Sequence, residues 1–346
     1  MKKTGEASYR QVWTAVFLAA LAPAATLPSV VAPFGPWGWL GVALLVPLAA
    51  LYPRLVKGLG GAGLGTALRT RWGRLGWWVL AVYYLWAAAL AALTAGSCVD
   101  RLGRTDYGEV PGWLAAVLLA AVAAYLIYRG RGAFLRAVQV FFLALVVVLG
   151  LFFLLGAANL RGENLRPDGW KDVWKGAGGL WPALATLSVG AIGGFLPHAP
   201  RQEGESRGWK WLAGWCLTAA GLCALVLGTL GAELTARAPL PFFLALQGIG
   251  FPGGFQRLEA MGTAAWVLSD LTLIGLTALA GVEIGGGKHR WAWPILLAAV
   301  LGGIWLPNRA VAGAGGWLFG VNVALGVVVP ILAAHGARGK KLPPQV

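Results

Sequence analysis

Charged side chains are scarce in this sequence. Its 346 residues include 28 Lys and Arg and 13 Asp and Glu, so 12% of the chain is charged, against roughly 25% in soluble domains. So few charges cannot cover the surface of a soluble protein of this size, and 58% of the residues are hydrophobic. We therefore interpret the chain as an integral membrane protein. Its net charge of +15 does not indicate nucleic-acid binding, because long uncharged runs separate the basic residues that such a groove would cluster.

Cysteine and histidine are also rare. The three cysteines, Cys98, Cys216 and Cys223, exclude a disulfide framework, and the three histidines are scattered without the spacing of metal ligands. The sequence contains no Ser/His/Asp grouping and no phosphate-binding loop. It therefore predicts no cofactor, no metal site and no enzymatic activity.

Long apolar runs dominate the chain, and about 20 such residues cross a bilayer as one helix. Residues 11–53 are free of charge and hold two spans, because Pro33-Phe34-Gly35-Pro36 interrupts them. Eight further spans are expected at residues 75–99, 110–128, 137–160, 176–197, 211–232, 260–282, 291–308 and 310–337. Residues 238–256 are rich in Pro and Gly, which favours a short helix at one interface. The sequence thus predicts ten transmembrane helices in a single membrane domain covering residues 1–346.

The basic residues indicate the topology. With ten spans and a cytoplasmic N-terminus, 19 of the 28 Lys and Arg residues face the cytoplasm, as the positive-inside rule requires. An eleventh span at residues 238–256 would move the last five of these outward. We therefore expect both termini on the cytoplasmic side. The alternative is a cleaved signal peptide ending near Ala22-Pro23-Ala24, which the continuation of the apolar run to Val31 disfavours.

Ten spans divide into two halves of five, residues 11–160 and 176–337, so the second half is inverted relative to the first. Inverted-repeat transporters bind substrate where corresponding helices are interrupted. Spans 1 and 6 are both rich in Pro or Gly, which permit unwound backbone. We expect the substrate site at residues Ala22, Pro23, Ala24, Ala25 and Thr26 of span 1, Gly190, Gly193 and Gly194 of span 6, and Tyr84 of span 3. The alternative is that these residues form ordinary kinks and packing points.

Asp270, in span 8, is the only charged side chain expected deep in the membrane, and it follows Ser269. Carboxylates are costly in the bilayer and mark ion or proton pathways. We therefore expect Ser269 and Asp270 to form an ion- or proton-coupling site. The alternatives are a protonated Asp270 hydrogen-bonded to a neighbouring helix, and a helix shifted so that Asp270 lies nearer an interface.

In their order and spacing, short motifs along nearly the whole chain resemble a known family. The resemblance is to the permease-like B subunit of spore-germination nutrient receptors, in the amino acid–polyamine–organocation superfamily. The motifs are Gln11, Leu27-Pro28, Gly38-Trp39-Leu40, Arg136, Phe141-Phe142, Asn164-Leu165-Arg166-Pro167, Pro241-Phe242-Phe243, Arg257-Leu258-Glu259-Ala260 and Trp266-Val267-Leu268. Gln139 stands where the family often has an acidic residue.

The resemblance implies an all-α, LeuT-like fold of ten transmembrane helices in a 5+5 inverted repeat, with helices 1 and 6 interrupted. It also implies a nutrient ligand such as an amino acid, and assembly with an A-type subunit and a lipoprotein C-type subunit in the spore inner membrane. Ligand binding would then shift the helix bundle and start signalling or ion release. Two other functions stay open: a free-standing proton-coupled amino acid transporter, and a membrane scaffold that transports nothing.

Overall fold

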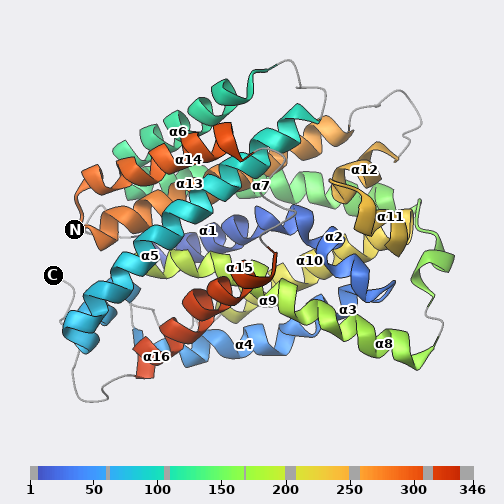
Figure 1. Ribbon diagram of the computed structural model, residues 1–346, viewed down its shortest axis with the longest axis horizontal. Helices are drawn as coiled ribbons and strands as arrows, with labels where there is room; N and C mark the ends of the chain where they lie inside the picture. The colour runs from blue at the N-terminus through green and yellow to red at the C-terminus, as the bar shows by residue number, and fades with distance from the viewer. Residues whose placement is uncertain are drawn as a thin grey trace.

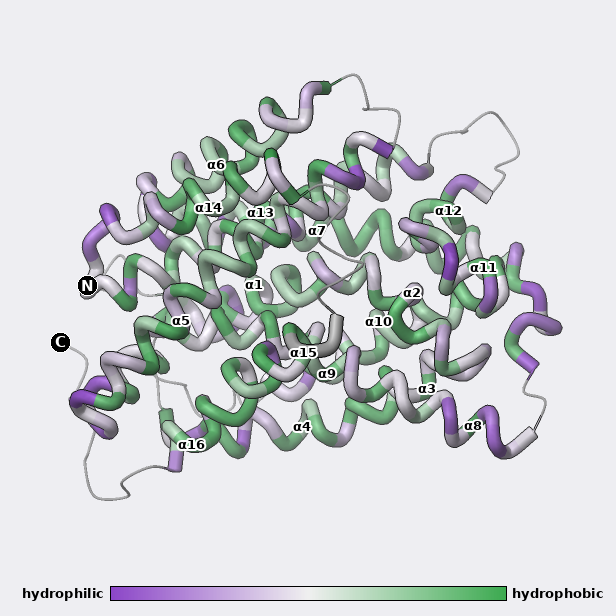
Figure 2. Tube along the Cα trace, in the orientation of Figure 1, coloured by the Kyte–Doolittle hydropathy of each residue, from purple (hydrophilic) through white to green (hydrophobic). Residues whose placement is uncertain are grey.

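The computed structural model describes residues 7–59, 63–104, 110–166, 169–198, 208–248, 258–306 and 315–335. Within these residues every regular element is a helix (Figure 1). Hydrophilic residues gather mainly at the left and right ends of the view in Figure 2, and apolar residues fill most of the length between them. This pattern suits a bundle whose two polar ends meet water on either side of a membrane.

The structure describes eleven helical segments in the first half of the chain. They are α1 (Tyr9–Leu21), η1 (Pro23–Thr26), α2 (Leu27–Val31), η2 (Ala32–Phe34), α3 (Trp39–Ala43), α4 (Leu45–Leu55), η3 (Lys57–Leu59), α5 (Leu64–Gly103), α6 (Gly112–Tyr128), α7 (Arg131–Ala157) and η4 (Gly162–Leu165). The second half begins with α8 (Trp170–Gly176), η5 (Ala177–Gly179), α9 (Leu180–Ser188), η6 (Val189–Phe195), α10 (Gly208–Leu230), α11 (Ala232–Arg237) and α12 (Pro241–Gln247). It continues with α13 (Leu258–Ile284), η7 (His289–Ala292), α14 (Trp293–Trp305), α15 (Gly315–Val323), the π-helical turn η8 (Ala324–Val328) and α16 (Val329–His335).

Eight helices of the described chain are long and apolar enough to cross a membrane. They are Tyr9–Phe34, Trp39–Leu59, Leu64–Gly103, Arg131–Ala157, Trp170–Phe195, Gly208–Leu230, Glu259–Ile284 and Leu318–His335. Two predicted spans correspond to shorter apolar helices, α6 with 17 residues and α14 with 13. The expectation of an all-α membrane protein is confirmed, and so is the short helix within residues 238–256, which is α12.

The helix α5 is longer than its predicted span because it begins on a separate leg. Gly73 has a φ of 54°, a backbone conformation that residues with a Cβ rarely adopt. The helical leg Leu64–Trp72 turns there into the membrane-crossing part of α5, which crosses the bundle diagonally in Figure 1. α5 packs along both α13 and α14.

The helices of the two halves pack in matching pairs. α7 packs on α1 as α15 packs on α9, and α14 packs on α5 as α6 packs on α13. α4 of the first half packs directly on α10 of the second. α1 and α13 are the most deeply buried of the candidate spans, so the core of the bundle lies around these two helices and η6.

Candidate functional site

The first span is interrupted where the prolines predict it. Pro23 removes a helical hydrogen-bond donor, and the chain tightens into the 3-10 turn η1 between α1 and α2. Thr26 Oγ1 donates to the carbonyl of Pro23 at 2.8 Å. The flanking residues Ala22 and Leu27 keep right-handed helical dihedral angles. The interruption is therefore a local change of helix type.

The second interruption is η6, which carries the three predicted glycines. A Cβ on Gly190 would lie 3.0 Å from the carbonyl oxygen of Val16 and 3.3 Å from the Cβ of Ala20. A Cβ on Gly193 would lie 2.5 Å from Val16 Cγ2, whereas one on Gly194 would meet nothing within 4 Å. Gly190 and Gly193 thus permit close packing of η6 on α1, and Gly194 is exposed. η6 lies opposite the last half of α1, so the two interruptions are offset along the bundle.

Trp266 of α13 reaches the first interruption. Its buried indole Nε1 donates to the carbonyl of Ala22 at 3.1 Å. Its ring packs on Phe242 of α12 with centroids 4.6 Å apart, and Phe242 packs on Phe152 of α7 at 4.9 Å. Ala24 and Ala25 are also buried here. Sequence reasoning used Trp266 only as a family motif, although a tryptophan far from either end of a span does not fit an interfacial belt.

Asp270 lies one helical turn beyond Trp266 and forms a buried ion pair with Arg101 of α5. Asp270 is therefore not the only charged side chain buried among the described residues. The apolar run of α5 ends at Val99, so the sequence alone predicts that Arg101 lies in an outer loop. The helix instead continues to Gly103. This continuation turns the Arg101 side chain, 1% exposed, inward against α13. Cys98, one turn earlier on α5, interacts with both charges.

Ser269 and Asp270 do not share a surface, because successive residues of an α-helix point about 100° apart. Ser269 lies on the same face as Leu276, whose Cδ2 is 3.5 Å from the position of a Cβ on Gly193 in η6. Asp270 faces α5, as does Gly281 three turns further on. The Ser269 hydroxyl is buried and has no hydrogen-bond partner in the described chain. Ser269 thus belongs with the interrupted helices, and Asp270 with Arg101.

The two adjacent tyrosines of α5 also have different neighbours. Tyr84 donates its hydroxyl to the carbonyl of Trp291 at 2.7 Å, away from both interruptions. Tyr83 is buried, and its ring lies 5.0 Å from that of Phe195 at the end of η6. Its hydroxyl donates to the carbonyl of Leu325 in the π-helical turn η8. The tyrosine that contacts the second interruption is therefore Tyr83.

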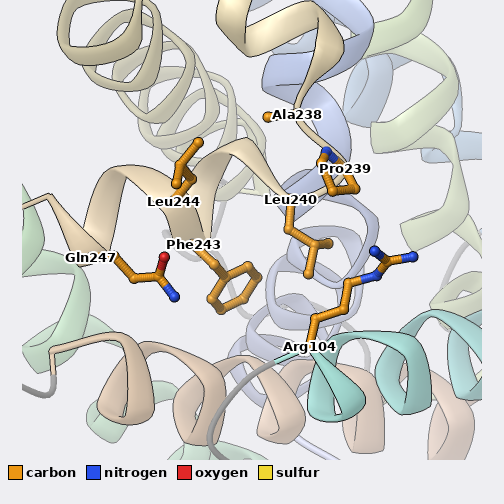
Figure 3. A pocket seen from close by; sticks show the side chains of 7 residues that line it. All are labelled: Arg104, Ala238, Pro239, Leu240, Phe243, Leu244 and Gln247. Atoms are coloured by element: carbon orange, nitrogen blue, oxygen red, sulfur yellow. The ribbon is translucent and has the colours of Figure 1, made fainter.

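A pocket of about 200 Å³ opens between α12 and the end of α5 (Figure 3). It is lined by Arg104, Ala238, Pro239, Leu240, Phe243, Leu244 and Gln247. Phe243 also contacts the buried ion pair, because its ring centroid lies 5.7 Å from the Arg101 guanidinium. The aromatic ring of Phe243 thus stands between the pocket and Arg101.

No three His, Cys, Asp or Glu side chains come together in the described residues as metal ligands would. The described residues instead offer an aromatic cluster whose Trp266 bonds to the first interruption, and a guanidinium and a carboxylate one helical turn further along α13. The unpartnered hydroxyl of Ser269 lies on another face of α13. Groups of these kinds bind small polar organic molecules.

A family model described as "Spore germination protein", of the spore permease type, matches residues 8–286. A search of curated proteins finds no match. The family match covers both interruptions, the Arg101–Asp270 pair and α12. The chain therefore belongs to the spore germination permease family of membrane proteins.

Proposed function

We propose that this chain is the nutrient-binding subunit of a spore germination receptor and that its ligand is an amino acid. The observation that carries the proposal is that Trp266 of α13 bonds to the first interruption one helical turn from the buried Arg101–Asp270 pair, in a member of this family. The ligand would lie between η1, α5 and α13, with Trp266 facing it. Its binding would favour one of two arrangements of the bundle by its difference in affinity for them.

The helix pairing supports a ten-helix inverted repeat for this subunit. The pairs α1–α7 and α9–α15, and the pairs α5–α14 and α6–α13, are those that a repeat of five helices would relate. In this arrangement α6 and α14 are the fourth and ninth spans. The partners would be an A-type subunit and a lipoprotein C-type subunit in the spore inner membrane, with both termini on the side of the basic loops. Signalling or ion conduction would follow from the shift of the bundle.

The Arg101–Asp270 pair favours a receptor over a proton-coupled transporter. A carboxylate that carries protons must be able to lose its charge, which here would leave the buried Arg101 guanidinium unpaired. Removing one partner of a buried ion pair costs roughly 3–5 kcal/mol. Asp270 is therefore better suited to holding a positive charge than to exchanging protons.

The test uses the full-length chain in proteoliposomes and each of the twenty amino acids. A ligand at 100 times its Kd stabilises the folded state by about 2.7 kcal/mol, which raises the thermal midpoint by several degrees. We expect at least one amino acid to do so without being taken up. Uptake that depends on pH and disappears with Asp270→Asn would identify a transporter. No stabilisation by any amino acid would favour the scaffold.

A further inference from the structure

The Arg101–Asp270 pair is an expensive arrangement inside a membrane protein. Both side chains are about 2% exposed, and each ion lost its hydration when it was buried. Apolar residues of similar volume often stabilise such a position as well or better. The Nε of Arg101 is buried as well and has no hydrogen-bond partner in the described residues. The guanidinium therefore has binding capacity that its contact with Asp270 does not use.

We propose that Arg101 and Asp270 recognise the two charges of a zwitterionic ligand, with the carboxylate of the ligand on Arg101 and its ammonium on Asp270. This inference rests on the proposed function and names the residues that would select the ligand. A zwitterion can enter a buried ion pair by exchange, because each protein charge gives up one partner and gains another. The guanidinium offers the parallel donors that a carboxylate binds in a bidentate manner.

The same logic excludes ligands of other charge. A simple cation would bind Asp270 and leave Arg101 unpaired in the interior, and a simple anion would do the reverse. A neutral sugar or nucleoside would offer neither charge a full replacement. The pair thus selects for two opposite charges a short distance apart, as in the ammonium and carboxylate of an α-amino acid.

The pocket under α12 provides the route to the pair. It opens beside Arg104 and Gln247, and the ring of Phe243 forms its inner wall. Because Phe243 also lies over the Arg101 guanidinium, a rotation of its side chain would join the pocket to the ion pair. The uncharged part of the ligand would then lie toward Trp266, one helical turn from Asp270 and bonded to the first interruption. A ligand bound to the Arg101–Asp270 pair would thereby contact Trp266 and, through it, the interrupted helix.

The experiment compares the wild type with the double variant Arg101→Met/Asp270→Leu, which removes both charges and keeps the apolar volume. Thermal unfolding of the full-length protein is measured with each of the twenty amino acids, with their N-acetyl derivatives and with their amides. We expect amino acids to stabilise the wild type, and each blocked derivative to bind about tenfold more weakly or worse. The double variant should unfold near the wild-type temperature and show no stabilisation by amino acids.

Two results would overturn the inference. One is a double variant that keeps wild-type affinity for the amino acid. This result would be consistent with the proposed function but would show that residues other than Arg101 and Asp270 bind the two charges of the ligand. The other is equal binding of an N-acetyl derivative or an amide to the wild type, a comparison that needs no variant to fold. Failure of every amino acid to bind the wild type would reject the proposed function as well. The reversed pair Arg101→Asp/Asp270→Arg keeps both charges and serves as the control for folding.

Discussion

Replacing the indole of Trp266 with a phenyl ring tests whether α13 holds the first interruption. In Trp266→Phe the ring still packs on Phe242, but the hydrogen bond to the Ala22 carbonyl, 3.1 Å long, is lost. The carbonyl of Ala22, a residue 4% exposed, keeps the backbone bond of the 3-10 turn and loses only this second donor. One lost hydrogen bond costs about 0.5–1.5 kcal/mol, and the smaller ring adds a cavity worth about 1 kcal/mol. We expect a loss of about 1.5–2.5 kcal/mol in the free energy of unfolding.

The assay is thermal unfolding of the full-length protein in one detergent, followed by near-ultraviolet circular dichroism. The control is Trp293→Phe, which makes the same chemical change on α14 where the side chain is 64% exposed. Exposed substitutions of this kind usually change stability by about 0.5 kcal/mol or less. If both variants lower the midpoint equally, Trp266 does not hold the carbonyl of Ala22 and the reasoning is refuted.

The two remaining predictions concern η6 and the segment that follows it. Gly193→Leu should destabilise the fold and weaken amino acid binding, because the new side chain would overlap α1. Gly194→Leu should leave stability and binding unchanged, because nothing lies within 4 Å of its Cβ. Equal binding by the two variants would contradict this packing. Burial lowers the pKa of His198, and the Arg131 guanidinium lowers it further. The unfolded chain therefore takes up a proton near pH 6.5 that the folded chain resists, so stability should fall below about pH 6.5. His198→Gln should flatten this pH dependence of the thermal midpoint and His289→Gln should not.

The spans and their interruptions could be predicted because they follow from local chemistry. A run of apolar residues crosses a membrane wherever it occurs, and Pro23 loses a helical donor in any context. The partner of Asp270 could not be predicted, because it depends on where α5 ends and on the angle at which α5 crosses α13. A charge two residues beyond an apolar run normally lies in water, and only the tertiary contact turns Arg101 inward.

The choice between neighbouring residues was also beyond the sequence. Tyr83 and Tyr84 have the same chemistry and adjacent positions, so only the rotation of α5 decides which one contacts η6. The same holds for Ser269 and Asp270 on α13. The sequence shows which helix carries a functional residue, but the packing of that helix determines which neighbouring helix its side chain contacts.

The contacts of α5 with α13 determine which parts of the bundle can move against each other. Arg69, on the first leg of α5, donates to the carbonyls at the end of α13, with 3.1 Å to that of Glu283. Arg101 binds the middle of α13 through Asp270. α13 is thus held to α5 at two levels, and α6 and α14 pack on the same two helices. We therefore expect these four helices to move together, and a ligand-driven displacement to fall on the α13–α1 surface, where Trp266 bonds to Ala22.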